Sequence, residues 1–159
     1  MSMPEILTKY FGSIEYQEAD VVQFSSGLPA FEDETRFLLI EPAASAPIVF
    51  LQSLRQSSLC FLTLPLQAVD PQYDLAVTSE DLQSLGLEPG QQPPDHAGLT
   101  CLAVIAVTEN GAVNANLLAP ILINRGGQRG LQAIRVDSLY SHEYPVTGLS
   151  GAHKEDACS

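Results

Sequence analysis

The apolar positions of the chain fall in short runs that are rich in β-branched and aromatic residues and are separated by turn-forming residues. The main runs occupy residues 6–11, 13–16, 21–24, 36–40, 48–54, 59–64, 99–107, 116–124 and 131–136. Short apolar runs at close intervals are typical of antiparallel strands. The pattern therefore predicts an all-β fold, an antiparallel β-barrel or sandwich of about ten short strands with one short helix.

The residues between the runs predict how the strands are connected. Gly12 separates the first two runs and indicates a bulge or a tight bend. The polar segment 55–58 predicts a hairpin loop, and the Asn110-Gly111 pair predicts a second hairpin because both residues tolerate positive φ. Pro120 cannot donate to a strand ladder, so the run that contains it must bulge, bend or lie at an edge there.

The one convincing helix is predicted to begin at Thr78. Thr78 and Asp81 have the spacing of a capping box, and Leu82 and Leu85 share one helix face. Gly86 supplies a left-handed stop. A helix this short is unstable alone in water, so we expect it to dock on the sheet.

Two segments are predicted to be mobile. Residues 86–98 contain three of the 11 prolines and three of the 11 glycines, a composition typical of a loop. Residues 147–159 are mostly small and polar, which predicts a disordered tail.

The charge balance narrows the possible partners. The chain has 159 residues, which suits one domain, and its 19 acidic and seven basic residues give a net charge of −12. Phosphates would be repelled, so direct nucleic-acid binding and an anionic membrane surface are disfavoured. An acidic surface favours basic protein partners. The alternative that acidity only maintains solubility stays open.

Several features indicate a cytoplasmic protein. No apolar run approaches the roughly 20 residues that a membrane helix needs. Residues 1–5 lack the basic and apolar parts of a signal peptide. The three cysteines (Cys60, Cys101 and Cys158) form no C-x-x-C pair, and two of them lie in apolar runs, so we interpret these two as free, buried thiols.

The chain offers little catalytic chemistry. The histidines, at 96, 142 and 153, lie in polar or Pro/Gly-rich surroundings with no metal-site spacing, so we expect no cofactor and no metal. No nucleophile elbow and no phosphate loop occurs. The triplet Glu32-Asp33-Glu34 has general-acid chemistry available, but such triplets are more often solvated turns. These observations favour a protein that is not an enzyme.

Three of the seven basic residues, Arg125, Arg129 and Arg135, lie in or near the glycine-rich turn 125–130. They would suit a small anion or an acidic segment of a partner. They are equally well explained as solubilising residues of a surface turn, and both interpretations stay open.

An ordered set of stretches resembles the FliW family of flagellar assembly factors. The stretches are Thr8-Lys9-Tyr10-Phe11-Gly12-Ser13-Ile14, Phe24 with Gly27-Leu28-Pro29-Ala30-Phe31-Glu32, Leu51-Gln52-Ser53, residues 116–124, residues 132–136 and Tyr144-Pro145-Val146. The most specific is 116–124, which matches Asn-Leu-x-Ala-Pro-Ile-x-Ile-Asn. Ala30 departs from a family glycine. Order and spacing agree over residues 5–146, so we expect one domain with these bounds.

The resemblance implies two protein partners. One is flagellin, held as a chaperone client in the cytoplasm. The other is CsrA, a small basic RNA-binding dimer that represses flagellin translation. Export of flagellin would free the protein to antagonise CsrA. We therefore expect a monomer that binds proteins, with no direct contact to nucleic acid or membrane.

Six side chains are the candidate partner contacts. They are Glu32, Asp33, Glu34, Asn116, Asn124 and Tyr144. The acidic three are expected on the surface of a signature turn, facing CsrA. Asn116 and Asn124 bracket a strand broken by Pro120, so their amides either replace missing backbone bonds or face a partner.

Two rival functions are open at this point. A β-barrel of this size can hold one small ligand, so the chain could be a ligand carrier or an enzyme built on a barrel. It could also be a subunit of an obligate oligomer without a regulatory role.

Overall fold

The computed structural model describes residues 4–9, 11–25, 27–28, 31–73, 78–87, 99–133 and 140–146. Its strands are β1 (Glu5–Thr8), β2 (Gly12–Glu15), β3 (Val21–Gln23), β4 (Arg36–Ile40), β5 (Val49–Ser53), β6 (Cys60–Pro65), β7 (Leu99–Val107), β8 (Val113–Ala115), β9 (Ile121–Asn124), β10 (Arg129–Gln132) and β11 (Tyr144–Val146). Its helices are α1 (Leu66–Val69) and α2 (Ser79–Ser84), with 3-10 turns η1 (Glu18–Asp20) and η2 (Ala43–Ser45). The predicted all-β fold is confirmed.

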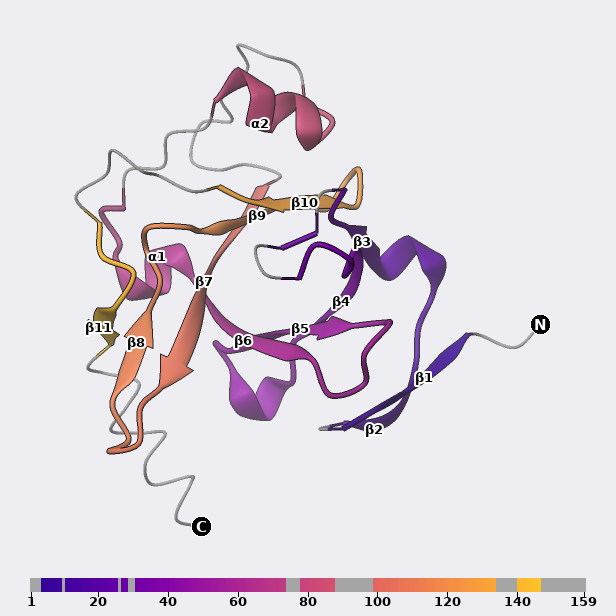
Figure 1. Ribbon diagram of the computed structural model, residues 1–159, viewed down its shortest axis with the longest axis horizontal. Helices are drawn as coiled ribbons and strands as arrows, with labels where there is room; N and C mark the ends of the chain where they lie inside the picture. Colours follow the sequence, from indigo (N-terminus) through magenta and orange to yellow (C-terminus); the bar gives the residue numbers. More distant parts are fainter. Residues whose placement is uncertain are drawn as a thin grey trace.

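Seven of these strands close into a barrel (Figure 1). They follow each other in the order β7-β6-β5-β4-β3-β10-β9, and β9 pairs back onto β7. Of the two predicted architectures, barrel and sandwich, the barrel is therefore the one formed. Closure gives every barrel strand a neighbouring strand on both sides, so the ring has no free edge.

Strand β7 holds two parts of the molecule together because it changes partner along its length. On one side it pairs with β6. On the other side, Leu99–Leu102 pairs with β9 and Ile105–Val107 pairs with β8. Strand β8 in turn pairs with β11, so β7 continues out of the ring as a three-stranded extension, β7-β8-β11.

One pairing in the ring differs from the antiparallel prediction. Strands β3 and β10 run parallel, with Arg129 opposite Gln23. The reason is geometric: alternating strand directions close into a ring without a parallel pair only when the number of strands is even, and this ring has seven. At least one pair must be parallel, and the pair here is short, as its single register position shows.

The interior of the barrel is filled by the segment that follows β3 as well as by the strands. Phe24 and Leu28 pack with Phe37, Leu51 and other inward-facing strand residues in one cluster. The rings of Phe24 and Phe37 meet edge to face, with centroids 5.4 Å apart. Figure 1 shows this segment inside the ring. The Phe24 and Phe37 rings are both fully buried.

Two further apolar clusters lie outside the ring. One joins α1 and the β7-β8-β11 extension, and includes Leu66, Tyr73 and Leu117. Tyr73 donates its hydroxyl hydrogen to the Leu117 carbonyl oxygen at 2.6 Å and stacks on Tyr140. The other cluster places α2 against strands β7, β9 and β10 through Leu82 and Leu85. Docking of α2 on the sheet, as predicted, explains how so short a helix persists.

The prediction of a single short helix is wrong, because α1 is also helical. Helix α1 spans four residues and follows Pro65, whose fixed φ ends strand β6. Four residues are too few to show a helical period in the sequence. Helix α2 begins as predicted: the Thr78 hydroxyl oxygen accepts a hydrogen bond from the Asp81 backbone N–H at 3.0 Å.

The predicted connections are also present. Gly12 has φ +67° in the turn of the β1–β2 hairpin, and Gly111 has φ +85° in the β7–β8 turn. Strands β5 and β6 form the predicted hairpin. Pro120 lies outside the ladder, since β9 begins at the next residue.

Some predictions concern residues outside the described ranges. Nearly all of the loop 86–98 and all of the tail 147–159 fall there. The last predicted strand, 131–136, is described only to residue 133. Strand β10 begins two residues earlier than that prediction, at Arg129, in what the sequence indicates as a turn.

A stability prediction follows from the contact between β10 and Phe24. A Cβ atom added to Gly130 would lie 2.6 Å from Cζ of the fully buried Phe24 ring. We expect Gly130→Ala to lower the free energy of unfolding by about 1–3 kcal/mol through overpacking. Gly126→Ala is the matched control, because its nearest neighbour is 3.5 Å away. Urea unfolding followed by circular dichroism measures both, and equal stability of the two variants would contradict the expectation.

Candidate partner-binding surface

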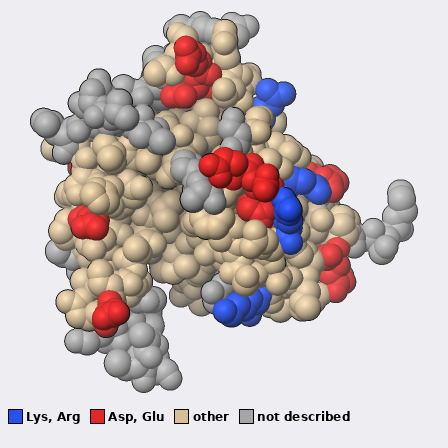
Figure 2. Space-filling view, viewed as in Figure 1, with Lys and Arg blue, Asp and Glu red and all other residues tan. Residues whose placement is uncertain are grey.

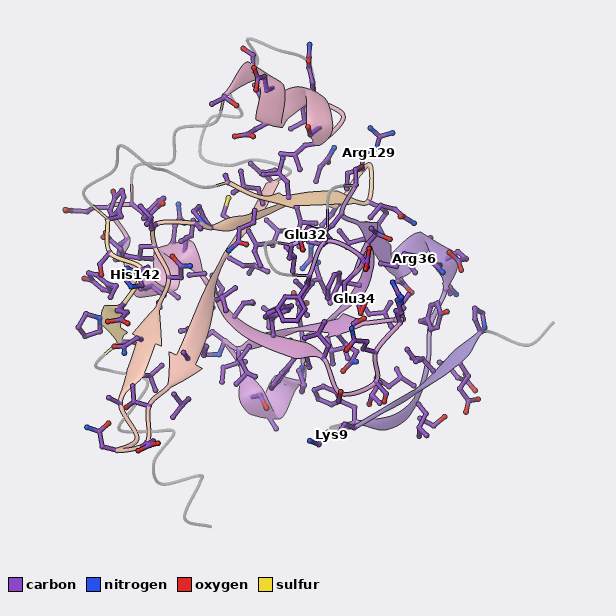
Figure 3. All side chains as sticks on the ribbon, in the orientation of Figure 1. Lys9, Glu32, Glu34, Arg36, Arg129 and His142 are labelled. Carbon is purple, nitrogen blue, oxygen red and sulfur yellow. The ribbon has the colours of Figure 1, made fainter. Side chains whose placement is uncertain are left out.

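The turn that carries the acidic triplet lies over one open end of the barrel (Figure 3). A backbone bridge holds its start: the Phe31 N–H donates to the Leu28 carbonyl oxygen at 2.7 Å. The ring of Phe31 packs edge to face on Phe61. With Phe31 directed inward, Glu32 and Asp33 are left exposed. The Arg55 guanidinium donates to the Asp33 carbonyl oxygen at 3.2 Å, which ties the turn to the β5–β6 loop.

The expectation that Glu34 lies on the surface is wrong. Its side chain is only 2% exposed. The backbone N–H of Glu34 donates to the Phe31 carbonyl oxygen at 2.9 Å, and this tight turn directs the side chain under the β5–β6 hairpin. There one carboxylate oxygen accepts a long hydrogen bond, 3.4 Å, from the Ser53 hydroxyl. The other oxygen has no hydrogen-bond partner among the described residues.

The two asparagines that bracket Pro120 hold the backbone. Oδ1 of Asn116 accepts hydrogen bonds from the N–H groups of Leu118 and Ala119, both at 3.1 Å. Asn124 is buried, and its Nδ2 donates to the Leu85 carbonyl oxygen at 2.8 Å, at the end of α2. Of the two roles that the sequence leaves open, these contacts support the structural one. A partner contact by either amide stays a prediction.

Tyr144 lies on the outermost strand, β11, with 37% of its surface exposed. Its neighbour Pro145 is opposite Asn114 of β8. Three residues after Asn114, the Leu117 N–H donates to the Ser141 carbonyl oxygen, so Leu117 faces the β11 side. Backbone groups alternate in an antiparallel ladder, so the nitrogen of Pro145 points away from β8. The open side of β11 therefore presents a proline, which has no N–H to donate.

The structure adds residues that the sequence does not link to the turn. Glu32 lines a hollow of about 430 Å³ together with Asp81 and Ser84 of α2 and Gln132 of β10. The sequence indicates Asp81 only as a helix-capping residue, and no short-range pattern places it beside Glu32. Figure 2 shows acidic side chains near the middle of this face, next to a few basic ones.

The basic residues of the glycine-rich turn do not form a cluster in the described part of the chain. Arg125 donates to Glu41 at 2.6 Å and to the Thr100 hydroxyl at 3.0 Å. Arg129 is exposed near α2, and Arg135 lies outside the described residues. Arg125 therefore fastens one end of the barrel, between the ends of β4, β7 and β9.

The described residues offer no group of three metal-ligating side chains. His142 is exposed beside Glu143, and His96 and His153 lie outside the described ranges. Within those ranges no helix is long and apolar enough to cross a membrane. A hollow of about 280 Å³ between α1 and β7 is mainly apolar and lined by Val49, Leu66 and Leu102. The fold and the exposed acidic turn thus define a β-barrel protein with a polar surface as the candidate site.

Comparison with known proteins gives the family. The model of the family described as "FliW protein" matches residues 5–146. Flagellar assembly factor FliW of Syntrophomonas wolfei is 32% identical over 143 residues, covering 89% of this chain and 88% of the relative. Flagellar assembly factor FliW of Bacillus subtilis is 30% identical over 145 residues, covering 91% of this chain and 98% of the relative. A crystal structure of the flagellar assembly factor FliW superposes with a TM-score of 0.79 at 28% identity, covering 90% and 96%. The chain belongs to the FliW family.

The two described cysteines are free and half-buried, less buried than the sequence predicts. Burial raises the pKa of the Cys60 and Cys101 thiols from 9.0 to about 11. Below pH 9 their thiolate fraction is roughly a hundredfold lower than in the unfolded chain. We expect iodoacetamide labelling at pH 8 to be at least about tenfold slower for both than in urea-unfolded protein. The labelling rates are measured by mass spectrometry of the peptides. If the rate still rises between pH 9 and 11 in the folded protein but not in the unfolded protein, the raised pKa is the cause.

The structural role of Asn124 gives a separate prediction. In Asn124→Ala the buried Leu85 carbonyl loses its donor, and we expect the free energy of unfolding to fall by about 1–3 kcal/mol. Gln83→Ala changes an exposed side chain of α2 and is the control. Thermal unfolding measures both variants. An Asn124→Ala protein with unchanged stability and lost partner binding would show instead that the amide contacts a partner.

Proposed function

We propose that the protein is a cytoplasmic flagellar assembly factor that acts by binding two proteins rather than by catalysis. In this proposal it holds flagellin as a chaperone client. When flagellin is exported, the free protein binds CsrA and relieves the repression of flagellin translation. Residues 5–146 act as one domain.

The observation that supports the proposal most directly is the exposed acidic turn on a chain of the FliW family. Glu32 and Asp33 are held outward by a bridge at Leu28 and Phe31, over a hollow that Asp81 also lines. With a net charge of −12, such a surface suits a basic partner that otherwise binds RNA. Tyr144 is the remaining exposed candidate, and we place it among the partner contacts.

Calorimetry tests the proposal directly. The protein is titrated into CsrA of the same organism, and the titration is repeated in the presence of flagellin. We expect sub-micromolar binding, by analogy with the affinities of specific complexes, and its loss when flagellin is present. No binding to either protein would overturn the proposal and favour a ligand-carrier function for the barrel.

Charge reversal at the acidic turn gives a residue-level prediction. We expect Glu32→Lys with Asp33→Lys to weaken CsrA binding roughly tenfold at low salt and to flatten its salt dependence. Glu34 is left unchanged because it is buried. The control is Glu80→Lys with Glu109→Lys, which makes the same charge change at exposed positions of α2 and the β7–β8 turn. Equal losses in both double variants would assign the effect to overall charge and not to this turn.

A further inference from the structure

The β1–β2 hairpin forms a separate two-stranded sheet that lies beside the barrel (Figure 1). It is fastened at its turn: the Lys9 N–H donates to the Ser57 carbonyl oxygen at 2.9 Å, and Phe11 packs on Phe50 with centroids 5.0 Å apart. Thr8 is buried at this attachment, and Ile6 and Ile14 are half-buried on the same side. The barrel-facing side of the hairpin is thus at least half-buried.

The opposite face carries Glu5, Leu7, Ser13 and Glu15. Because side chains alternate along a strand, the residues paired as Glu5 with Glu15 and Leu7 with Ser13 point to the same side. All four are exposed, and Leu7 is 70% exposed, the highest value among the large apolar side chains of the described residues. No described residue covers this face.

The charge arrangement on this face is unfavourable within the isolated molecule. Glu5 and Glu15 are direct cross-strand neighbours, and like charges directly opposite each other destabilise a hairpin. The Ser13 hydroxyl donates to the Glu5 carboxylate, which is a neutral contact. The ion pairs found in the described ranges use other carboxylates, those of Glu18, Glu41 and Glu143. A cation placed between Glu5 and Glu15 would remove the repulsion.

We propose that this outer face of the β1–β2 hairpin is a docking surface for a basic protein, with Leu7 entering an apolar site and Glu5 and Glu15 binding Lys or Arg side chains. The proposal rests on the proposed function, whose basic partner is CsrA. A second copy docked face to face through the same hairpin does not fit, because its own Glu5 and Glu15 would meet the same two carboxylates. An anionic membrane is repelled for the same reason.

The inference is tested with four variants of the full chain, two test variants and two controls, each titrated into CsrA by calorimetry. We expect Glu5→Lys with Glu15→Lys to weaken binding at least tenfold and Leu7→Ala three- to tenfold. Glu80→Lys with Glu109→Lys is the control for charge. Val107→Ala is the control for the apolar contact, since Val107 is 50% exposed at the tip of β7. Both controls are expected to bind within about twofold of the unchanged protein. Thermal unfolding confirms that each variant is folded.

The outcomes separate this inference from the proposed function. If the unchanged protein binds CsrA and the hairpin variants bind equally well, the docking surface is overturned while the proposed function stands. If the unchanged protein binds neither CsrA nor flagellin, both are overturned. Sedimentation that shows a dimer of the unchanged protein, converted to monomer by Leu7→Ala, would assign the face to a second copy and also overturn the inference.

Discussion

The pairing of β7 is the constraint on which the rest of the structure depends. Its first half closes the ring on β9, and its second half carries the extension through β8. Around Leu102 and Ala103, both buried, the strand passes from one partner to the other while β6 stays on its opposite side. Ring and extension are therefore not independent parts, since one continuous strand belongs to both. The parallel β3–β10 pair is a consequence of that closure with seven strands.

The exposed acids are arranged by apolar anchors rather than by electrostatic contacts. Phe31 enters the barrel, and its burial decides that Glu32 and Asp33 point outward and Glu34 inward. On the hairpin, the packing of Phe11 on Phe50 fixes which face turns to the barrel, so Glu5 and Glu15 lie on the other. In both places, packing fixes the direction of carboxylates whose charges do not stabilise the fold. Hydrophobic packing is the larger energy and sets the position of the charges.

Much of the fold follows from local patterns in the sequence. Short β-branched runs predict the strands, Gly12 and Gly111 predict turns that require positive φ, and Thr78 predicts the start of α2. Ring closure between β9 and β7 and the parallel pair are set by contacts distant in the chain, so local patterns do not contain them. The site shows the same division. The acidic triplet is visible in the sequence, but the burial of Glu34 and the place of Asp81 in the same hollow as Glu32 depend on how Phe31 and α2 pack.

Pro145 on the outermost strand has a consequence for how this sheet edge can pair with another molecule. A strand that joined β11 from another molecule would find an acceptor at this position but no donor, so the ladder would lack a bond at its centre. The extension therefore ends in a poor template for edge-to-edge growth, although it exposes Val107 and Tyr144. Edge-to-edge joining of this strand with the same strand of another copy is therefore disfavoured.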